Sequence, residues 1–383
     1  MPEHTPPPSD APEAAVPADR LGWWALIGAF AAFVSVGVPL QMLSAGAGIW
    51  FTEVFLFFGL GWALVRWSGR APAPYLGLAW PGALPLLFAL GVAVTNYFAV
   101  VIPLQFFVQL LAPRSWVEMF DQTQVFERRS GLELFLAVTG AVAAAPIGEE
   151  VIFRGLLLQG WLRRGVAVVP AVVASALIFS LCHVNPIGFP ALFELGVVFG
   201  LIYVRTRSVL PGMAAHLGSN LTATLLYLVS KGQDSGPVEA AQLPAVLVTS
   251  ALAWGVLGLV LAAARRIPGA WGRPMAEEVL LPRVRLTRAL APWVVSGVVL
   301  LGAWALADRR SLSLDMADLQ VRLPPPRAGE PSWAAKRRAE LESLREEVRG
   351  GKAPLERYVG QRRKLAEQLG PGASEAAPDP ASR

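Results

Sequence analysis

Long apolar runs, each of about twenty residues, fill most of this sequence and are separated by short polar or arginine-bearing stretches. A run of ~18 or more apolar residues is long enough to cross a lipid bilayer as a helix. Of the 383 residues, 54% are hydrophobic and 16% are charged, whereas a soluble domain carries about 25% charged residues. The sequence therefore predicts an all-α fold, a polytopic transmembrane helix bundle.

The runs predict about eight or nine spans, since a helix needs about 20 apolar residues to cross. Tryptophans flank several of their ends, as in the aromatic belts of membrane proteins. The candidate spans are Leu21–Leu43, Ile49–Val65, Leu84–Leu111, Leu132–Leu158, Val166–Leu181, Ile187–Val204, Val209–Val229, Leu243–Ala264 and Ala289–Ala307.

Arginines in the short loops predict the orientation of these spans. Most arginine-rich loops fall on one side of the bundle, which the positive-inside rule assigns to the cytoplasm, together with the N-terminus. One loop disagrees with this orientation: it carries Arg114, Arg128 and Arg129 but falls on the side opposite the cytoplasm. The excess of arginine over lysine and the abundance of Ala, Gly and Pro indicate a bacterial host. We expect a multi-pass protein of the bacterial inner membrane, with the lipid bilayer as a partner.

The net charge of +5 is spread over the loops between the apolar runs and forms no single basic groove. A nucleic-acid-binding protein concentrates its lysines and arginines in one patch or stripe. The sequence therefore predicts no nucleic-acid partner. The single cysteine, Cys182, excludes a disulfide framework and a cysteine-based metal cluster.

Composition divides the chain into three parts. Residues 1–20 are polar and Pro-rich, which predicts a disordered tail before the transmembrane domain of residues 21–307. Residues 308–383 are charged and predict a soluble tail with two helices, Ser332–Arg349 and Ala353–Leu369. The tail is interpreted as a solvated helical appendage. A segment that docks a substrate or a partner is the alternative.

Ionisable side chains inside the apolar runs are the most informative residues for function. A charged group costs at least ~2.5–3.5 kcal/mol at the centre of a span, so such residues usually face a polar interior. The fourth span carries Glu149, Glu150 and Arg154. His183 and His216 lie in or at the ends of two later runs. This clustering predicts a functional site inside the bundle.

Helical geometry assigns different roles to the two adjacent glutamates. Residues four apart share a helix face, whereas neighbours diverge by about 100°. Glu150 therefore shares a face with Arg154, and Glu149 shares one with Phe153. We interpret Glu150 and Arg154 as a structural, charge-neutralising pair, which leaves Glu149 free for chemistry.

Two further pairs have the same spacing. Phe179 and His183 place an aromatic ring beside an imidazole, and His216 and Asn220 place two hydrogen-bonding groups on one face of another helix. We expect Pro211–Gly212 to break or tilt that helix. A lone membrane histidine is about as often an interhelical hydrogen bonder as a catalyst. Three such motifs in separate spans instead predict a joint catalytic site.

With these motifs the sequence resembles the CPBP intramembrane proteases, which include type II CAAX prenyl endopeptidases and bacteriocin-processing or immunity (Abi-like) homologues. The resemblance covers roughly Glu133 to Leu228, a core of about residues 130–230, and rests on three segments: EEVIFRG (Glu149–Gly155), FSLCH (Phe179–His183) and HLGSN (His216–Asn220). It implies an intramembrane endopeptidase whose substrate is a membrane-associated peptide or protein. The family's functional residues match without substitution at Glu149, Glu150, Arg154, His183, His216 and Asn220.

Two versions of the chemistry remain open. In the first, Glu149 with His183 removes a proton from water, and His216 and Asn220 donate hydrogen bonds to the oxyanion. In the second, Glu149, His183 and His216 hold a Zn²⁺ ion whose fourth position carries the water. We favour the metal-free version, since no further carboxylate shares the face of Glu149 to act as base.

Two alternatives from other functional classes are compatible with the same residues. A non-proteolytic membrane scaffold or immunity protein would retain the protease fold, and its phenotype would survive replacement of Glu149. An ion-coupled or proton-coupled transporter would use the carboxylates and histidines as a relay. It would also show inverted repeats of its spans, and the sequence shows none.

Overall fold

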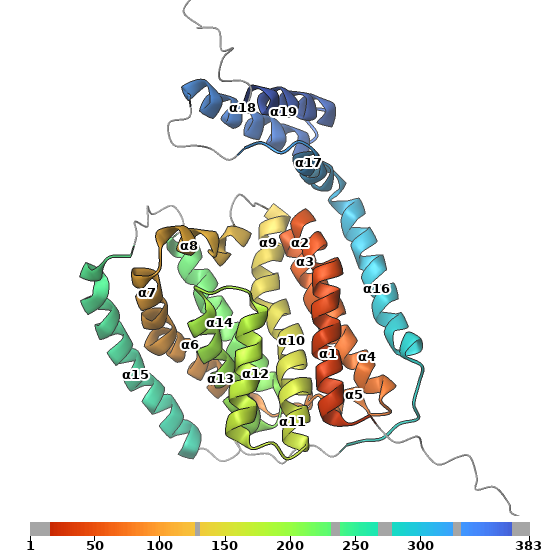
Figure 1. The fold of residues 1–383 in the computed structure, drawn as a ribbon, viewed down its shortest axis with the longest axis vertical. Coiled ribbons are helices and arrows are strands. Elements are labelled where there is room, and N and C mark those ends of the chain that lie inside the picture. Colours follow the sequence, from red (N-terminus) through yellow and green to blue (C-terminus); the bar gives the residue numbers. More distant parts are fainter. Residues whose placement is uncertain (1–15, 127–130, 231–237, 267–277, 325–330, 370–383) are drawn as a thin grey trace, which may run out of the picture. The chain divides into compact units, whose positions relative to one another are not determined.

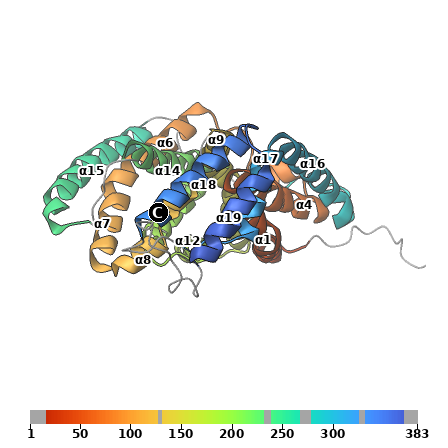
Figure 2. The same ribbon diagram turned by 90° about the horizontal axis from the view of Figure 1, so that it is seen from above.

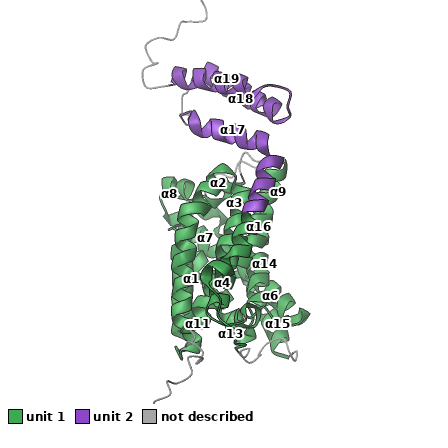
Figure 3. Cartoon of the chain, turned by 90° about the vertical axis from the view of Figure 1, so that its right-hand side faces the viewer, with its two compact units in different colours: residues 1–297 green, residues 298–383 purple. Residues whose placement is uncertain are grey.

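A computed structural model describes residues 16–126, 131–230, 238–266, 278–324 and 331–369. The chain forms two compact units, Met1–Gly297 and Val298–Arg383 (Figure 3). The division falls inside one helix, whereas the change of composition lies after Ala307. Most of the predicted disordered tail, residues 1–15, lies outside the described residues, and the first helix begins at Ala18.

Among the described residues every regular element is a helix, which confirms the all-α class. In chain order the elements before the site are α1 (Ala18–Ala32), η1 (Phe33–Gly37), α2 (Val38–Leu43), α3 (Ala45–Phe51), η2 (Thr52–Gly59), α4 (Leu60–Trp67), α5 (Pro72–Tyr75), α6 (Ala83–Asn96), η3 (Tyr97–Val101), α7 (Ile102–Leu111), α8 (Arg114–Met119) and η4 (Gln122–Val125). The remaining elements are α9 (Gly131–Thr139), η5 (Gly140–Ala144), α10 (Ala145–Glu150), η6 (Val151–Leu158), α11 (Gln159–Arg163), α12 (Val168–Cys182), α13 (Phe189–Thr206), α14 (Val209–Ser230), η7 (Ala240–Gln242), α15 (Leu243–Arg266), α16 (Leu286–Ala307), α17 (Arg309–Gln320), α18 (Ser332–Arg349) and α19 (Leu355–Leu369).

Seven helices in the described parts of the chain are long and apolar enough to cross a membrane, which confirms a polytopic bundle. They are Ala18–Leu43, Ala45–Trp67, Ala83–Leu111, Gly131–Arg163, Phe189–Thr206, Ala240–Arg266 and Leu286–Ala307. The other two predicted spans also form helices. Helix α12 has only 15 residues, and α14 has 22 but is less apolar, because it carries polar site residues.

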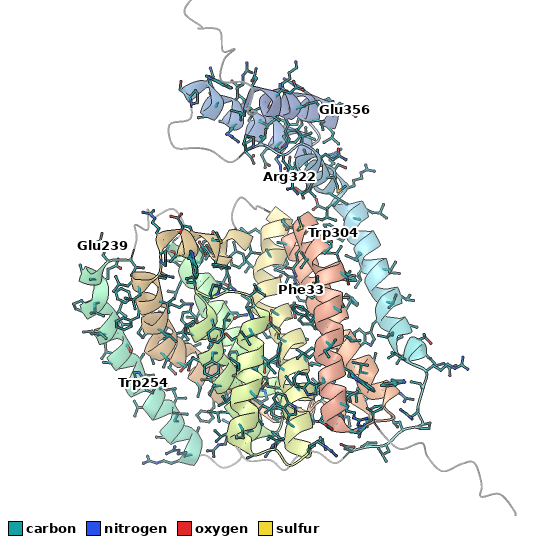
Figure 4. All side chains as sticks on the ribbon, in the orientation of Figure 1. Phe33, Glu239, Trp254, Trp304, Arg322 and Glu356 are labelled. Carbon is teal, nitrogen blue, oxygen red and sulfur yellow. The ribbon has the colours of Figure 1, made fainter. Side chains whose placement is uncertain are left out.

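The helices of the first unit pack side by side (Figure 1). Helix α6 contacts α14 and α15, α12 contacts α13, and α1 contacts η6. Seen from above in Figure 2, α15 lies at one edge of this bundle. Its Trp254 side chain is exposed (Figure 4), as expected for a helix that faces lipid. The helices with the predicted motifs lie further inside.

The second unit packs α17, α18 and α19 around a small apolar core. Arg345 contacts Asp315 at 2.5 Å and Asp318 at 3.2 Å, and Arg362 contacts Asp318 at 3.1 Å. The Tyr358 hydroxyl donates a hydrogen bond to Asp318 over 2.6 Å. Burial, together with this hydrogen bond, raises the pKa of the Tyr358 phenol. These contacts satisfy the charges that lie over the core.

Candidate active site

The long helix Gly131–Arg163 carries the first motif, where the α-helix passes into π-helical turns. Glu149 and Glu150 end α10, and Arg154 lies in η6. Such π-helical turns within α-helices are frequent at functional sites. The Glu150 Oε1 atom lies 2.8 Å from Arg154 Nη1, and both side chains are fully buried. The predicted pair is therefore present.

The Arg154 guanidinium is enclosed by groups from three helices. Besides Glu150, its Nη2 atom donates a hydrogen bond to the Gly196 carbonyl oxygen over 3.0 Å. Its Cζ atom lies 4.7 Å from the ring centre of Phe179 and 5.4 Å from that of Phe199. Aromatic faces attract a cation, and the attraction is larger where water is excluded. The site thus stabilises a positive charge inside the bundle.

His216 lies between the two glutamates. Its Nδ1 atom is 3.1 Å from Glu150 Oε1, and its Nε2 atom is 3.8 Å from Glu149 Oε2. Because a carboxylate paired with an arginine only accepts hydrogen bonds, Nδ1 is the donor to Glu150. The imidazole also stacks on Phe199, with ring centres 4.8 Å apart. Glu150 therefore orients His216 in addition to pairing with Arg154. The contact with His216 was not predicted from the sequence.

Gly212 makes room for this arrangement one helical turn before His216. A Cβ atom at Gly212 would lie 2.9 Å from Glu150 Oε2, closer than an ordinary contact. Pro211–Gly212 does not break the helix, as α14 runs continuously from Val209 to Ser230. The expected break was wrong because Pro211 lies in the first turn, where a missing N–H is tolerated. The glycine instead allows the carboxylate to approach α14.

Phe179 lies close to both histidines. Its ring centre is 4.8 Å from that of His183 and 6.0 Å from that of His216. His183 follows the last residue of α12, and its Nδ1 atom lies 2.8 Å from the Phe179 carbonyl oxygen. A carbonyl only accepts, so Nδ1 carries the hydrogen and Nε2 is left as an acceptor. The second motif therefore adjoins the first.

Asn220 lies one turn beyond His216 on α14. Its Nδ2 atom donates a hydrogen bond to the Ala141 carbonyl oxygen in η5 over 2.8 Å. An amide group carries two hydrogens, so one donor remains after this bond. The structure thus attaches the third motif to the same long helix that carries Glu149.

Several buried polar atoms around these residues have no hydrogen-bond partner in the described part of the chain. They are Glu53 Oε2, Glu149 Oε2, Glu150 Oε2, Arg154 Nε and Ser219 Oγ. Buried polar groups are normally satisfied, and exceptions indicate water, an ion or a catalytic role. Unsatisfied groups from η2, α10, η6 and α14 make this region the best-supported candidate active site.

Sequence reasoning missed the roles of Phe199, Gly212, Ser219 and Glu53. Glu53 lies on η2, and a Cβ atom at Gly148 would collide with its carboxylate. In the sequence Glu53 is noticeable only as a carboxylate within an apolar run. Such a residue by itself indicates no more than a buried hydrogen-bonding group. Phe199 gave no signal, since aromatic residues are common in apolar helices.

The zinc version requires Glu149, His183 and His216 to converge on one ion. Among the described residues no group of three His, Cys, Asp or Glu side chains is placed to hold a metal. Glu149 and His216 contact each other, and the hydrogen bond from Nδ1 of His183 to the backbone leaves Nε2 as the only ring nitrogen of His183 that could bind an ion. In this arrangement the three donors do not fit a zinc ion, and we derive no step through one.

The comparison with protein families agrees with this geometry. The family model for Rce1-like type II CAAX prenyl endopeptidases matches residues 131–222, the segment that contains all three motifs. The match confirms the resemblance to the CPBP/CAAX proteases. No curated protein and no solved structure matches the chain. The helices and the family match together make this chain a membrane protein in which residues 131–222 are similar to this protease family.

Proposed function

We propose that this chain, with its CAAX-protease-type core, is an intramembrane endopeptidase that hydrolyses a peptide bond of a membrane-associated protein or peptide. One observation carries the proposal. Arg154, Glu150, His216 and Glu149 form a continuous series of contacts that joins α10 and η6 to α14. Such a series supplies a base, an oriented imidazole and a counter-charge in one place.

Glu149 is the general base. Its side chain is 14% exposed, and its Oε2 atom has no hydrogen-bond partner among the described residues. Glu150, in contrast, is fully buried and already bonded to Arg154. A base must reach the proton that it removes, within hydrogen-bond distance. The Glu149 side chain is thus partly exposed and has an oxygen without a partner among the described residues, whereas Glu150 is enclosed.

His183 assists the base. Its Nδ1 hydrogen points to the Phe179 carbonyl oxygen, which fixes the tautomer and leaves the Nε2 lone pair for a water molecule. The ring contact with Phe179 holds the imidazole in place. In the proposed reaction His183 orients the attacking water and Glu149 removes one of its protons as the oxygen attacks the scissile carbonyl carbon. Glu149 then gives this proton to the leaving amine nitrogen as the C–N bond breaks.

His216 and Asn220 stabilise the oxyanion. Glu150 holds the Nδ1 hydrogen of His216, so the opposite ring nitrogen, Nε2, is directed toward Glu149 and the reacting groups. As an imidazolium with hydrogens on both ring nitrogens, His216 donates a hydrogen bond from Nε2 to the developing negative charge. Asn220 contributes its second amide hydrogen. Donors that are oriented in advance in a water-poor site lower the barrier by several kcal/mol, about 2.7–4 for one donor.

The proposed substrate is a membrane-anchored peptide, a propeptide or a signal-like segment. A bacterial cell normally lacks prenylated CAAX proteins, and the arginine distribution supports placement in a bacterial inner membrane with a cytoplasmic N-terminus. The metal-free version is proposed because the carboxylate and histidine donors do not converge as a metal site requires.

The test is cleavage of a peptide library by the purified protein in detergent, with the products identified by mass spectrometry. Glu149→Gln preserves the size of the side chain but removes the base, and we expect the rate to fall about 10²- to 10⁴-fold. His183→Ala should lower the rate in the same assay. The matched control is Glu194→Gln on α13, whose partner is Asn96 at 3.0 Å, and it should retain activity.

Cleavage by Glu149→Gln at the wild-type rate would contradict the peptidase proposal. If the protein is instead a non-proteolytic scaffold, replacing Glu149 should leave its biological phenotype unchanged. Thermal unfolding of each variant in the same detergent distinguishes a lost base from a lost fold.

A further inference from the structure

The second unit contains a cavity of about 340 Å³ beside the first turn of α17. Its polar lining consists of Arg309, Arg310 and Ser313 from α17, and its apolar lining includes Val348, Pro354 and Leu355 from α18, α19 and the turn between them. Pockets that bind small molecules usually measure about 300–1,000 Å³ and combine apolar walls with a few polar groups. This cavity has both properties.

The two arginines in this lining have no ion-pair partner among the described residues. In the described residues of the second unit, neither Arg309 nor Arg310 forms an ion pair, and no acidic residue lines the cavity. The contrast within the same unit is clear, since Arg345 and Arg362 are both paired with aspartates. Two adjacent unpaired guanidinium groups predict an anionic ligand.

The turn after α18 lies against one of these guanidinium groups. Gly351 has φ +74°, a left-handed conformation that glycine adopts without strain. A Cβ atom at this position would lie 2.8 Å from Arg310 Cζ. The backbone of the turn therefore lies close to the Arg310 guanidinium, and the absence of a side chain at Gly351 leaves room for it.

The position of the arginines in the chain identifies the source of the anion. Arg309 and Arg310 follow Ala307, the last residue of an apolar helix that is long enough to cross a membrane. At ~1.5 Å per residue they lie within about 5 Å of the end of that span. This is the depth of the lipid headgroups, which form a layer of several ångströms on each side of the hydrocarbon. A phospholipid phosphate is the anion available there.

We propose that Arg309 and Arg310 bind the phosphate of a phospholipid headgroup, with the glycerol and upper acyl carbons against Val348, Pro354 and Leu355. Arginine pairs with phosphate through two parallel hydrogen bonds, and basic residues next to a span attract anionic lipids. The apolar wall distinguishes this ligand from free phosphate, which has no apolar part. The site attaches the helical tail to the bilayer surface and is separate from the proposed peptidase residues.

The test measures lipid binding to the full-length protein in a neutral detergent by native mass spectrometry. The probes are short-chain phosphatidylglycerol, a diacylglycerol with the same chains but no phosphate, and inorganic phosphate. We expect the wild-type protein to retain phosphatidylglycerol and to bind the other two much more weakly. Arg309→Gln with Arg310→Gln should weaken phosphatidylglycerol binding about 25-fold, or about fivefold for each arginine.

The matched control is Arg337→Gln on α18, which removes one charge from an exposed pair with Glu340 in the same unit. It should leave phosphatidylglycerol binding unchanged, and circular dichroism should show equal helix content in all variants. Wild-type affinity in the double variant would overturn the proposal, as would an equal loss in Arg337→Gln. Inorganic phosphate bound as tightly as the lipid would also overturn it, because the cavity would then be a free-phosphate site.

Discussion

Two arginine–carboxylate clusters in this protein use the same chemistry in different surroundings. In the membrane bundle Arg154 and Glu150 are both fully buried. In the helical tail the side chain of Arg345 is 12% exposed, and those of its aspartate partners are 32% and 27% exposed. The cost of removing charges from water is therefore much larger in the first cluster.

The clusters also differ in how completely their atoms are bonded. In the tail Arg345 contacts two aspartates, and Asp318 also accepts from Tyr358. In the bundle Glu150 Oε2, Glu149 Oε2 and Arg154 Nε have no partner in the described part of the chain. A saturated cluster near the surface stabilises a fold. A cluster inside a span whose polar atoms are not all hydrogen-bonded leaves those atoms available to bind water and substrate.

The largest expected effect is that of Arg154→Met. It removes the cationic partner of Glu150 and leaves this buried carboxylate with only the hydrogen bond from His216, which costs about 3–5 kcal/mol of stability. Unfolding of the purified protein with increasing SDS measures this loss. Adding Glu150→Leu removes the remaining charge and should restore most of the stability without activity. If Arg154→Met lowered the stability no more than Arg345→Met does, the comparison of the two clusters would be contradicted.

Gly212→Ala should have an intermediate effect on the site. Its Cβ atom would lie 2.9 Å from Glu150 Oε2, and Glu150 has little freedom to move because Arg154 and His216 both hold Oε1. We expect a loss of about 1–3 kcal/mol, as for other overpacking changes, and a fall in cleavage rate of about tenfold, or about 1.4 kcal/mol in the barrier.

The control for this substitution is Gly258→Ala on α15, where an added Cβ atom has nothing within 4 Å. The same change of residue type there should alter neither cleavage nor stability by more than about 0.5 kcal/mol. If Gly212→Ala behaved like this control, Gly212 would have no part in positioning Glu150.

Arg345→Met should have a smaller effect, confined to the tail. Its partners are partly exposed to water, and such ion pairs contribute about 1 kcal/mol or less. Hydrogen exchange in α17 and α19 should accelerate, while peptide cleavage stays at the wild-type rate. A loss of cleavage in this variant would show that the two clusters are coupled.

The smallest expected effect is that of a chelator. The donors Glu149, His183 and His216 do not form a metal site in this arrangement, so treatment with EDTA followed by dialysis should leave the cleavage rate unchanged. Loss of activity that added Zn²⁺ restores would instead support the zinc version of the chemistry. Inductively coupled plasma mass spectrometry of the purified protein provides an independent measurement.

The sequence predicted the fold class and most spans because apolar length alone decides whether a helix can cross a membrane. It predicted α12 and α14 as full spans, and both form helices. Helix α12 has only 15 residues: it begins at Val168, after the loop that follows Arg163, and ends at Cys182. Helix α14 is less apolar because one of its faces carries His216 and Asn220, which point into the protein rather than to lipid.

By itself the sequence determined the apolar helices and the pairing of Glu150 with Arg154, since residues four apart meet on any helix. Only the tertiary structure decided that Glu150 also contacts His216, and that Phe199 and Gly212 belong to the site. These contacts join residues that are 17 to 66 positions apart and lie on separate helices. They depend on how separate helices are aligned and rotated against one another, which side-chain packing across the whole bundle decides.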